Sequence, residues 1–302
     1  MTIQRTPDAR FADLPAYDFE PHYVELDDTD LGKLRVHYLD EGPRDGPVIL
    51  CMHGNPSWCY LYRKMLPVMV AAGYRVLAPD LVGFGRSDKP SHADDYSYAK
   101  HIAWMRDWLL ALGVSNITLV AQDWGGLIGL RLLTAMPELF SAMSLANTGL
   151  PTGDHPMPEA FLKWAAWCAG TNEFDAGLVV NEFGRGTLSD AEVDAYRAPF
   201  PDQSYLTHVK AFASLVPSTA DNAESENNRQ AWQQLMRWDK PVLLCFSNGD
   251  PVTGGGDKVF MKLVPGTRGQ PHITLDGGHF IQETRGEEWA SAIVNWLDAM
   301  PG

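Results

Sequence analysis

Cysteine is scarce in the sequence, and the few present show neither a disulfide framework nor a zinc site. Only four occur among 302 residues, and none has the Cys-X-X-Cys or clustered spacing of metal ligands. Scattered cysteines in apolar segments are usually buried free thiols. We therefore expect four reduced side chains at Cys51, Cys59, Cys168 and Cys245. Because the sequence shows no cluster of metal ligands and a histidine can activate water, we also expect no metal and no cofactor.

Long apolar runs and positive charge are also lacking. No segment is an apolar run long enough to cross a bilayer, and residues 1–14 lack the apolar core of a secretion signal. The 38 acidic residues outnumber the 24 basic ones, which gives a formal net charge of −14. A nucleic-acid partner would require a concentrated basic face. We expect a cytoplasmic monomer that binds neither membranes nor nucleic acids.

The sequence does contain short apolar segments that alternate with longer segments of helical periodicity. This alternation is typical of a mostly parallel, doubly wound α/β sheet. The expected strands are Leu34–Tyr38, Val48–Met52, Tyr74–Ala78, Ile117–Ala121, Ala142–Leu145, Val242–Phe246 and His272–Leu275. The expected helices are Tyr60–Ala72, Tyr98–Leu112, Gly125–Ala135, Trp232–Arg237, Lys258–Leu263 and Glu287–Met300.

The alternation stops between residues 151 and 228. There the chain becomes helical in pattern and rich in Trp, Phe and Pro, with no convincing strand. We interpret residues 151–228 as a helical cap inserted into a core made of residues 1–150 and 229–302. The predicted core is therefore discontinuous in sequence.

The segment ITLVAQDWGG, residues 117–126, predicts a buried strand that turns abruptly into a helix. Small residues are needed around such a turn, and Ala121 and Gly125 supply them. Asp123 then occupies the position of a nucleophile at the elbow. A carboxylate that attacks a saturated carbon leaves an ester, which activated water can hydrolyse, whereas a serine would leave a stable ether. The simpler interpretation is that Asp123 caps the following helix.

Two further polar segments follow expected strands and complete a possible triad. SNGDP ends with Asp250 and Pro251, and DGGHF contains His279. The chain order nucleophile, acid, base is that of the α/β-hydrolases, whose sites lie at the carboxyl ends of the strands. We predict that His279 takes a proton from the water that attacks the ester of Asp123, and that Asp250 orients the imidazole.

Other residues compete for parts of this site. Asp276 and Asp257 are alternatives to the acid, but we expect Asp276 to order its turn and Asp257 to cap a helix. The segment Cys51–Pro56 ends a strand where such folds supply an oxyanion donor. We expect the backbone N–H groups of Asn55 and Trp124 to hold the oxyanion, and the His53 ring to hold the loop.

Four motifs together resemble the haloalkane dehalogenases of the α/β-hydrolase superfamily. They are HGNPSW at 53–58, GFGRSDKP at 83–90, QDWGG at 122–126 and GHF at 278–280. The resemblance covers nearly the whole chain and implies an α/β-hydrolase fold. It also implies the function, hydrolysis of a small apolar haloalkane by water to a primary alcohol and halide.

The resemblance further implies that two ring N–H groups hold the departing halide. Trp124 matches the tryptophan that directly follows the nucleophile. The segment FLKW resembles the family's cap tryptophan segment and makes Trp164 the second candidate, with Trp167 one helical turn away as the alternative. Either ring could instead fill the interface between cap and core. Asn55 stands where one branch has Glu or Gln, so its side chain could also contact the halide.

The same resemblance favours Asp250 as the acid, because another branch places its acid where this chain has Asn147. Two alternative functions stay open. An epoxide hydrolase has similar Asp, Trp and His positions but needs proton donors, for which Tyr196 and Tyr205 in the cap are candidates. Fluoroacetate dehalogenases have arginines close after the nucleophile, whereas here Arg131 comes later. A non-catalytic binding protein with this fold is the remaining alternative.

Overall fold

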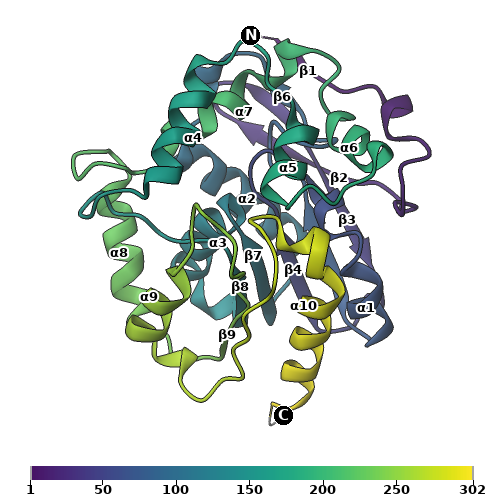
Figure 1. Cartoon of the computed structure of the whole chain (residues 1–302). Coiled ribbons are helices and arrows are strands. Elements are labelled where there is room, and N and C mark those ends of the chain that lie inside the picture. Colours follow the sequence, from purple (N-terminus) through teal and green to yellow (C-terminus); the bar gives the residue numbers. More distant parts are fainter. Residues whose placement is uncertain (1, 301–302) are drawn as a thin grey trace.

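The computed structural model describes residues 2–300, and its centre is a seven-stranded sheet in the order β2–β3–β5–β4–β7–β8–β9 (Figure 1). Neighbouring strands from β5 to β9 run parallel, whereas β3 is antiparallel to both β2 and β5. The predicted mostly parallel sheet is thereby confirmed. The strands are β2 (His22–Asp28), β3 (Gly32–Glu41), β4 (Val48–Met52), β5 (Arg75–Pro79), β7 (Ile117–Gln122), β8 (Phe140–Ala146) and β9 (Val242–Leu244), and β1 (Ile3–Gln4) pairs separately with β6 (Lys89–Pro90).

Helices cover both faces of the sheet, so the apolar side chains form two cores. One core contains α1 (Leu66–Ala71) and α10 (Ile281–Asp298), and the other contains α2 (Tyr98–Leu112), α3 (Trp124–Ala135), α8 (Ser225–Leu235) and α9 (Gly256–Leu263). Side chains along β4 alternate between the two cores, as the two-residue period of a strand requires. The central strands β4 and β7 are therefore buried along their whole length.

Four helices lie between β8 and α8, in the segment expected to be a cap. They are α4 (Glu159–Gly170), α5 (Ala176–Phe183), α6 (Asp190–Arg197) and α7 (Thr207–Ala211). In Figure 1 they lie above the carboxyl ends of the central strands. The 3₁₀ turns are Asp8–Phe11, Cys59–Tyr62, Ala93–Asp95, Pro137–Leu139, Gln203–Leu206, Phe212–Leu215 and Pro265–Thr267.

Several predicted elements are wrong in detail. The single helix expected at Tyr60–Ala72 is a 3₁₀ turn followed by α1, whose second residue is Pro67. Proline fits the first turn of a helix, but it lacks the backbone N–H that a residue in the helix interior donates. The strand expected at His272–Leu275 makes only an isolated bridge, Ser247 to Leu275. There the ring Nδ1 of His272 accepts the N–H of Leu244, so a side chain replaces part of the ladder.

Two helices begin more than a full turn earlier than their periodicity predicts. α8 begins at Ser225 rather than Trp232, because its polar first turns are held by side-chain contacts such as the amide of Asn228 on the carbonyl of Pro151. α10 begins at Ile281 rather than Glu287, and it is interrupted at Arg285, where φ is −136°. All four cysteines are free and buried, as expected. None of the helices within residues 2–300 combines the length and apolar character that a bilayer crossing requires.

Candidate active site

Asp123 lies in the tight turn between β7 and α3, and its backbone is strained. Its φ of 52° and ψ of −130° fall outside the regions that an L-residue favours. The side chain does not cap α3, so the helix-cap interpretation is wrong. Instead, Oδ1 of Asp123 accepts a hydrogen bond from the backbone N–H of Asn55 at 2.8 Å.

Neighbouring residues leave room for this turn and fix it. A Cβ at Gly54 would clash with the Asp123 carboxylate, and a Cβ at Gly125 would clash with the carbonyl of Met52. The Asp123 N–H donates to the carbonyl of Asn147 at 3.0 Å, and the Thr148 hydroxyl donates to the carbonyl of Asp123 at 2.7 Å. The surroundings thus hold a backbone conformation that would otherwise relax.

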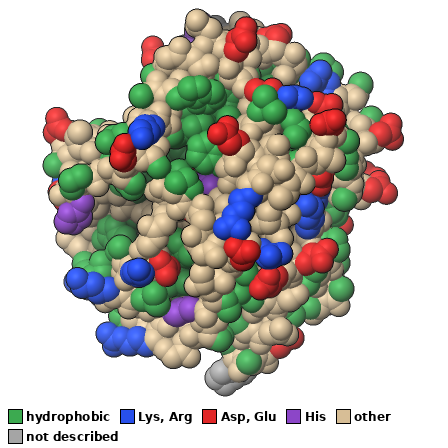
Figure 2. Space-filling view, in the orientation of Figure 1, with side chains coloured by type: hydrophobic (Ala, Val, Ile, Leu, Met, Phe, Trp, Pro, Cys, Tyr) green, Lys and Arg blue, Asp and Glu red, His purple; other side chains and the backbone are tan. Residues whose placement is uncertain are grey.

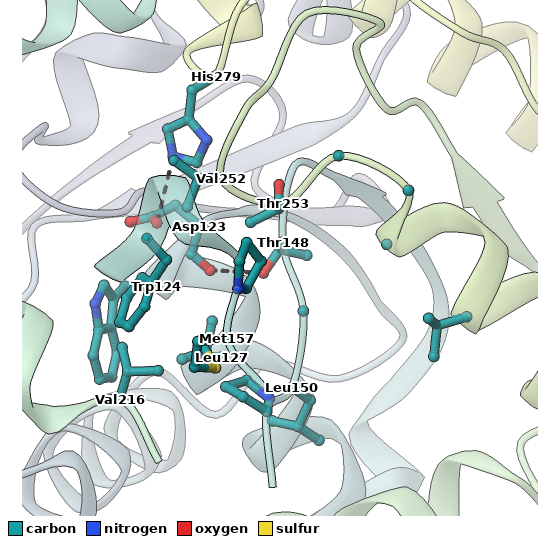
Figure 3. Close-up of a pocket in the computed structure, with 18 of the residues that line it drawn as sticks. Asp123, Trp124, Leu127, Thr148, Leu150, Met157, Val216, Val252, Thr253 and His279 are labelled. Carbon is teal, nitrogen blue, oxygen red and sulfur yellow. Dashed lines mark hydrogen bonds and ion pairs between the residues drawn. The ribbon is translucent and has the colours of Figure 1, made fainter. Parts of the chain in front are cut away.

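His279 lies between two carboxylates. Its Nδ1 is 3.0 Å from Oδ2 of Asp250, and its Nε2 is 3.4 Å from Oδ2 of Asp123, the pair drawn in Figure 3. Asp250 is held in turn by the N–H of Val252 at 2.8 Å and by the hydroxyl of Thr253. The structure therefore brings together the three side chains predicted as a triad.

The charges of this group strongly affect its protonation. Burial alone would lower the pKa of His279, but the carboxylates of Asp250 and Asp123 outweigh it and raise that pKa to about 10. Burial would raise the pKa of Asp250, yet His279 and the hydrogen bonds from Thr253 and Val252 lower it to about 2. Asp250 is therefore ionised at neutral pH, and the two carboxylates favour the protonated form of His279.

The competing carboxylates lie elsewhere. Asp276 has a side chain that is 60% exposed and pairs with Arg185 at 2.8 Å. Asp257 lies in the first turn of α9, but the residue that caps this helix is Gly255, so the capping role predicted for Asp257 is wrong. His53 is fully buried; its Nε2 accepts the N–H of Leu81, and its Nδ1 lies 3.0 Å from the carbonyl of Gly54. This ring holds the loop, as expected.

A cavity of about 520 Å³ opens beside the triad. Asn55, Asp123, Trp124, Trp164 and His279 all contribute to its lining. Its wall is otherwise mainly apolar and comes from α3, α4, α5 and the segment after β8. On the surface, apolar side chains gather over α4 and around the hollow beneath it (Figure 2). An apolar cavity with a few polar groups at one end suits a small organic substrate.

The two candidate cap tryptophans differ in position. Trp164 lines the cavity, whereas Trp167 is 43% exposed and is not part of the lining. The two rings stack with their centroids 5.4 Å apart. Trp124 is almost completely buried and packs against Phe212 and Tyr98. Three indoles line the cavity, but the N–H of Trp232 donates to the carbonyl of Leu150, which leaves Trp124 and Trp164 as the candidates beside the triad.

Three polar residues were missed as parts of the site. Nε2 of Gln122 lies 2.9 Å from Nε2 of His279 and donates to the His279 carbonyl. The amide of Asn147 donates to the same carbonyl at 2.8 Å and to the Ser247 hydroxyl, and Thr148 holds the elbow. All three lie at the carboxyl ends of β7 and β8. Because the active sites of α/β sheets form at these strand ends, their position in the sequence could have identified them as site residues.

Side chains that other chemistries would need are engaged elsewhere. The hydroxyl of Tyr196 is completely buried and donates to Glu283. Tyr205 does not contribute to the cavity lining. Arg131 hydrogen-bonds to Glu224 and is also outside the lining. The tyrosine pair of an epoxide hydrolase and the arginine clamp of a carboxylate-binding dehalogenase are therefore not formed by these candidates.

A second group of ionisable side chains lies apart from the cavity. His37, Cys59 and Asp80 each place a ligand-type atom within 4.8 Å of the others, and all are buried. Asp80 is already engaged, because it accepts N–H groups from Cys59 and Arg86 and lies 2.7 Å from Nδ1 of His37. These bonds tie the segment after β5 to its neighbours. The three residues are far apart in sequence, so their spacing could not reveal the group.

Comparison with known proteins agrees with the fold described above. Residues 47–286 match the family model described as the alpha/beta hydrolase fold. A haloalkane dehalogenase from Psychrobacter cryohalolentis is 53% identical over the whole of both chains, and one from Mycobacterium marinum is 45% identical over 98% of this chain and all of its own. The haloalkane dehalogenase structure from Paraglaciecola agarilytica, described as tetrameric, is 35% identical, covers 99% of both chains and has a TM-score of 0.90.

Proposed function

The chain belongs to the haloalkane dehalogenases of the α/β-hydrolase superfamily, enzymes that hydrolyse carbon–halogen bonds, and we propose that its attacking group is the carboxylate of Asp123. The observation that carries this proposal is the strained elbow, which presents Asp123 to an apolar cavity beside His279. An oxygen of Asp123 forms a bond to the substrate carbon, and the halide leaves with the electron pair of the broken bond. The product of this step is an alkyl ester of Asp123.

The second step hydrolyses that ester. Nε2 of His279 takes a proton from water, and the water oxygen adds to the carboxyl carbon of Asp123. The bond between the carboxyl carbon of Asp123 and the alkoxy oxygen then breaks, the alkoxide takes the proton held by His279 and leaves as the alcohol, and the carboxylate is restored on loss of one proton. One haloalkane and one water are thereby converted to one alcohol, one halide ion and one proton. Asp250 keeps Nδ1 of His279 protonated and the ring oriented, through the contact at 3.0 Å.

The ester carbonyl needs donors as it becomes an oxyanion. The N–H of Asn55 already lies 2.8 Å from Oδ1 of Asp123, and the N–H of Trp124 at the start of α3 is the second donor we propose. Losing a donor of this kind costs about 3 kcal/mol of transition-state stabilisation. Because the Asn55 contact is present before the reaction, little reorganisation is required.

We propose Trp124 and Trp164 as the halide ligands, and Trp164→Phe tests the second of them. The variant keeps an aromatic ring but removes the N–H. We expect bromide inhibition to weaken, and kcat/KM for 1-bromobutane to fall, by about tenfold or more, since hydrogen bonds to charged groups contribute about 1.5–3 kcal/mol. Steady-state kinetics with added bromide measures both quantities. Trp167→Phe is the matched control, because Trp167 is on the same helix but outside the cavity. Equal effects in both variants would contradict the assignment.

A paired turnover assay tests the reaction against its nearest alternative. We expect bromide release from 1-bromobutane and 1,2-dibromoethane, and no diol formation from styrene oxide. An opening epoxide needs a proton donor, but the hydroxyl of Tyr196 is bound to Glu283 and Tyr205 is outside the lining. Diol formation without bromide release would move the assignment to epoxide hydrolysis. Absence of both reactions would favour a non-catalytic binding protein.

We also propose that the helices between β8 and α8 act as a cap. Phe161 and Trp164 from α4 and Val179 from α5 line the same cavity as Asp123, which supports a boundary near the predicted 151–228. α8 begins at Ser225 and packs against α3, so the cap ends just before this helix.

The assembly and location of the protein stay predictions. A cytoplasmic monomer is expected, and the four buried free thiols agree with a reducing compartment. The tetramer described for the Paraglaciecola protein is the alternative assembly, and light scattering of the purified chain distinguishes the two.

A further inference from the structure

The cavity is larger than a short haloalkane requires. Its volume of about 520 Å³ falls in the range of about 300–1,000 Å³ that holds drug-sized molecules. From Asp123 the lining continues along the segment after β8 and reaches α8 and α9. We call this part the distal arm; it is lined by Leu150, Met157, Trp232, Val259 and Phe260. In Figure 3, His279 lies at one end of the residues drawn, and Met157 and Leu150 lie toward the other.

The walls of the distal arm are apolar and fixed. The Trp232 N–H donates to the carbonyl of Leu150 at 2.7 Å, and the Trp232 ring lies 5.3 Å from that of Phe260. Among the described residues that line the whole cavity, Asp123 is the one carboxylate and none is Lys or Arg. The arm therefore suits an uncharged apolar chain rather than a charged one.

Gly149 lies between the catalytic end and the distal arm. It lines the cavity and separates Thr148, which bonds to Asp123, from Leu150. Neither a left-handed φ nor close packing explains a glycine here, because its φ is not left-handed and, apart from its two chain neighbours, no described residue would place an atom within 4 Å of a Cβ added to it. An alanine at such a position would reduce the conformational entropy of the unfolded chain and normally stabilise the protein. Because Gly149 lines the cavity and a Cβ there would meet open space, we infer that a larger side chain at this position would narrow the cavity.

We propose that Gly149 sets the length of the haloalkane chain that the cavity accepts. The carbon that bears the halogen lies at Asp123, and the rest of the chain passes Gly149 into the distal arm. The proposal rests on the dehalogenation described above and on Asp123 as the attacking residue. It names one residue that determines specificity for chain length.

The test compares chain length in the wild-type enzyme and in Gly149→Leu. Bromide release is measured for bromoethane, 1-bromobutane, 1-bromohexane and 1-bromooctane. In the wild type, kcat/KM should rise by up to about fourfold for each methylene added beyond the butyl chain, the gain expected from burying it. In Gly149→Leu, the ratio of kcat/KM for 1-bromooctane to that for bromoethane should fall by about tenfold or more. Gly149→Ala should give an intermediate ratio.

Gly170 provides a matched control. It also lacks a left-handed φ and has open space around a Cβ, but it ends α4 outside the cavity lining. Gly170→Leu should keep the wild-type ratio. A flat chain-length profile with bromide released from bromoethane would overturn the proposal and leave dehalogenation intact. Equal ratios in Gly149→Leu, Gly149→Ala and the wild type would also overturn it, and no bromide release from any substrate would overturn both proposal and function.

Discussion

Replacing Asp123 by alanine is expected to abolish halide release, with kcat lowered by about 10⁴-fold or more. The reason is that Asp123 is the carboxylate that lines the cavity, and His279 cannot form the ester in its place. Bromide release from 1-bromobutane measures the loss, and circular dichroism verifies that the variant is folded.

Asp276→Asn is the control for this experiment. Asp276 lies three residues before His279, but its side chain is largely exposed and pairs with Arg185. Its replacement should leave kcat within about twofold of the wild type, as expected for a surface change away from the site. Substantial bromide release by Asp123→Ala would show that another group attacks the substrate.

Replacing His279 by glutamine is expected to stop the reaction after its first step. The carboxylate of Asp123 remains free to displace halide, but water is no longer deprotonated, so the alkyl ester accumulates. We expect one equivalent of bromide in a burst, followed by turnover slowed by about 10³-fold or more. Intact-protein mass spectrometry should show the mass of one butyl group added after incubation with 1-bromobutane.

The location of this adduct can be checked directly. Peptide mapping should place the butyl group on Asp123, and the double variant with Asp123→Ala should carry none. Multiple turnovers by His279→Gln at the wild-type rate would contradict the role of His279 as base. A burst without any covalent adduct would contradict the ester mechanism itself.

The elements that the sequence predicted best are those with local signals at both ends. The helix at Tyr98–Leu112 matches to the residue, because Ser97 caps its start through the N–H of Lys100 and Gly113 ends it with a left-handed φ of 63°. The strand at Val48–Met52 also matches and is buried throughout. Elements without such signals were predicted wrongly. In the strand expected from His272 onward, for example, the ring of His272 accepts the N–H of Leu244 in place of a backbone carbonyl.

In the site, too, residues within local sequence patterns could be predicted, whereas contacts between residues far apart in the sequence could not. Asp123, Asp250 and His279 follow strands in the order that the fold requires, so their positions could be predicted from the chain alone. The contact of Gln122 with His279 joins residues 157 apart, and no local pattern reveals it. Periodicity also could not separate Trp164 from Trp167, because residues three apart share one helix face and only tertiary packing decides which one reaches the cavity.

We propose that the position of His279 between two carboxylates imposes an order on the reaction. In the resting enzyme both charges raise its pKa, to about 10, so the ring carries a proton at neutral pH and cannot accept another. Alkylation turns the carboxylate of Asp123 into a neutral ester and removes one of those charges. The pKa of His279 then falls, and the ring can give up its proton and act as a base. We therefore expect His279 to become an active base only after the ester has formed, so that alkylation of Asp123 controls when water is activated.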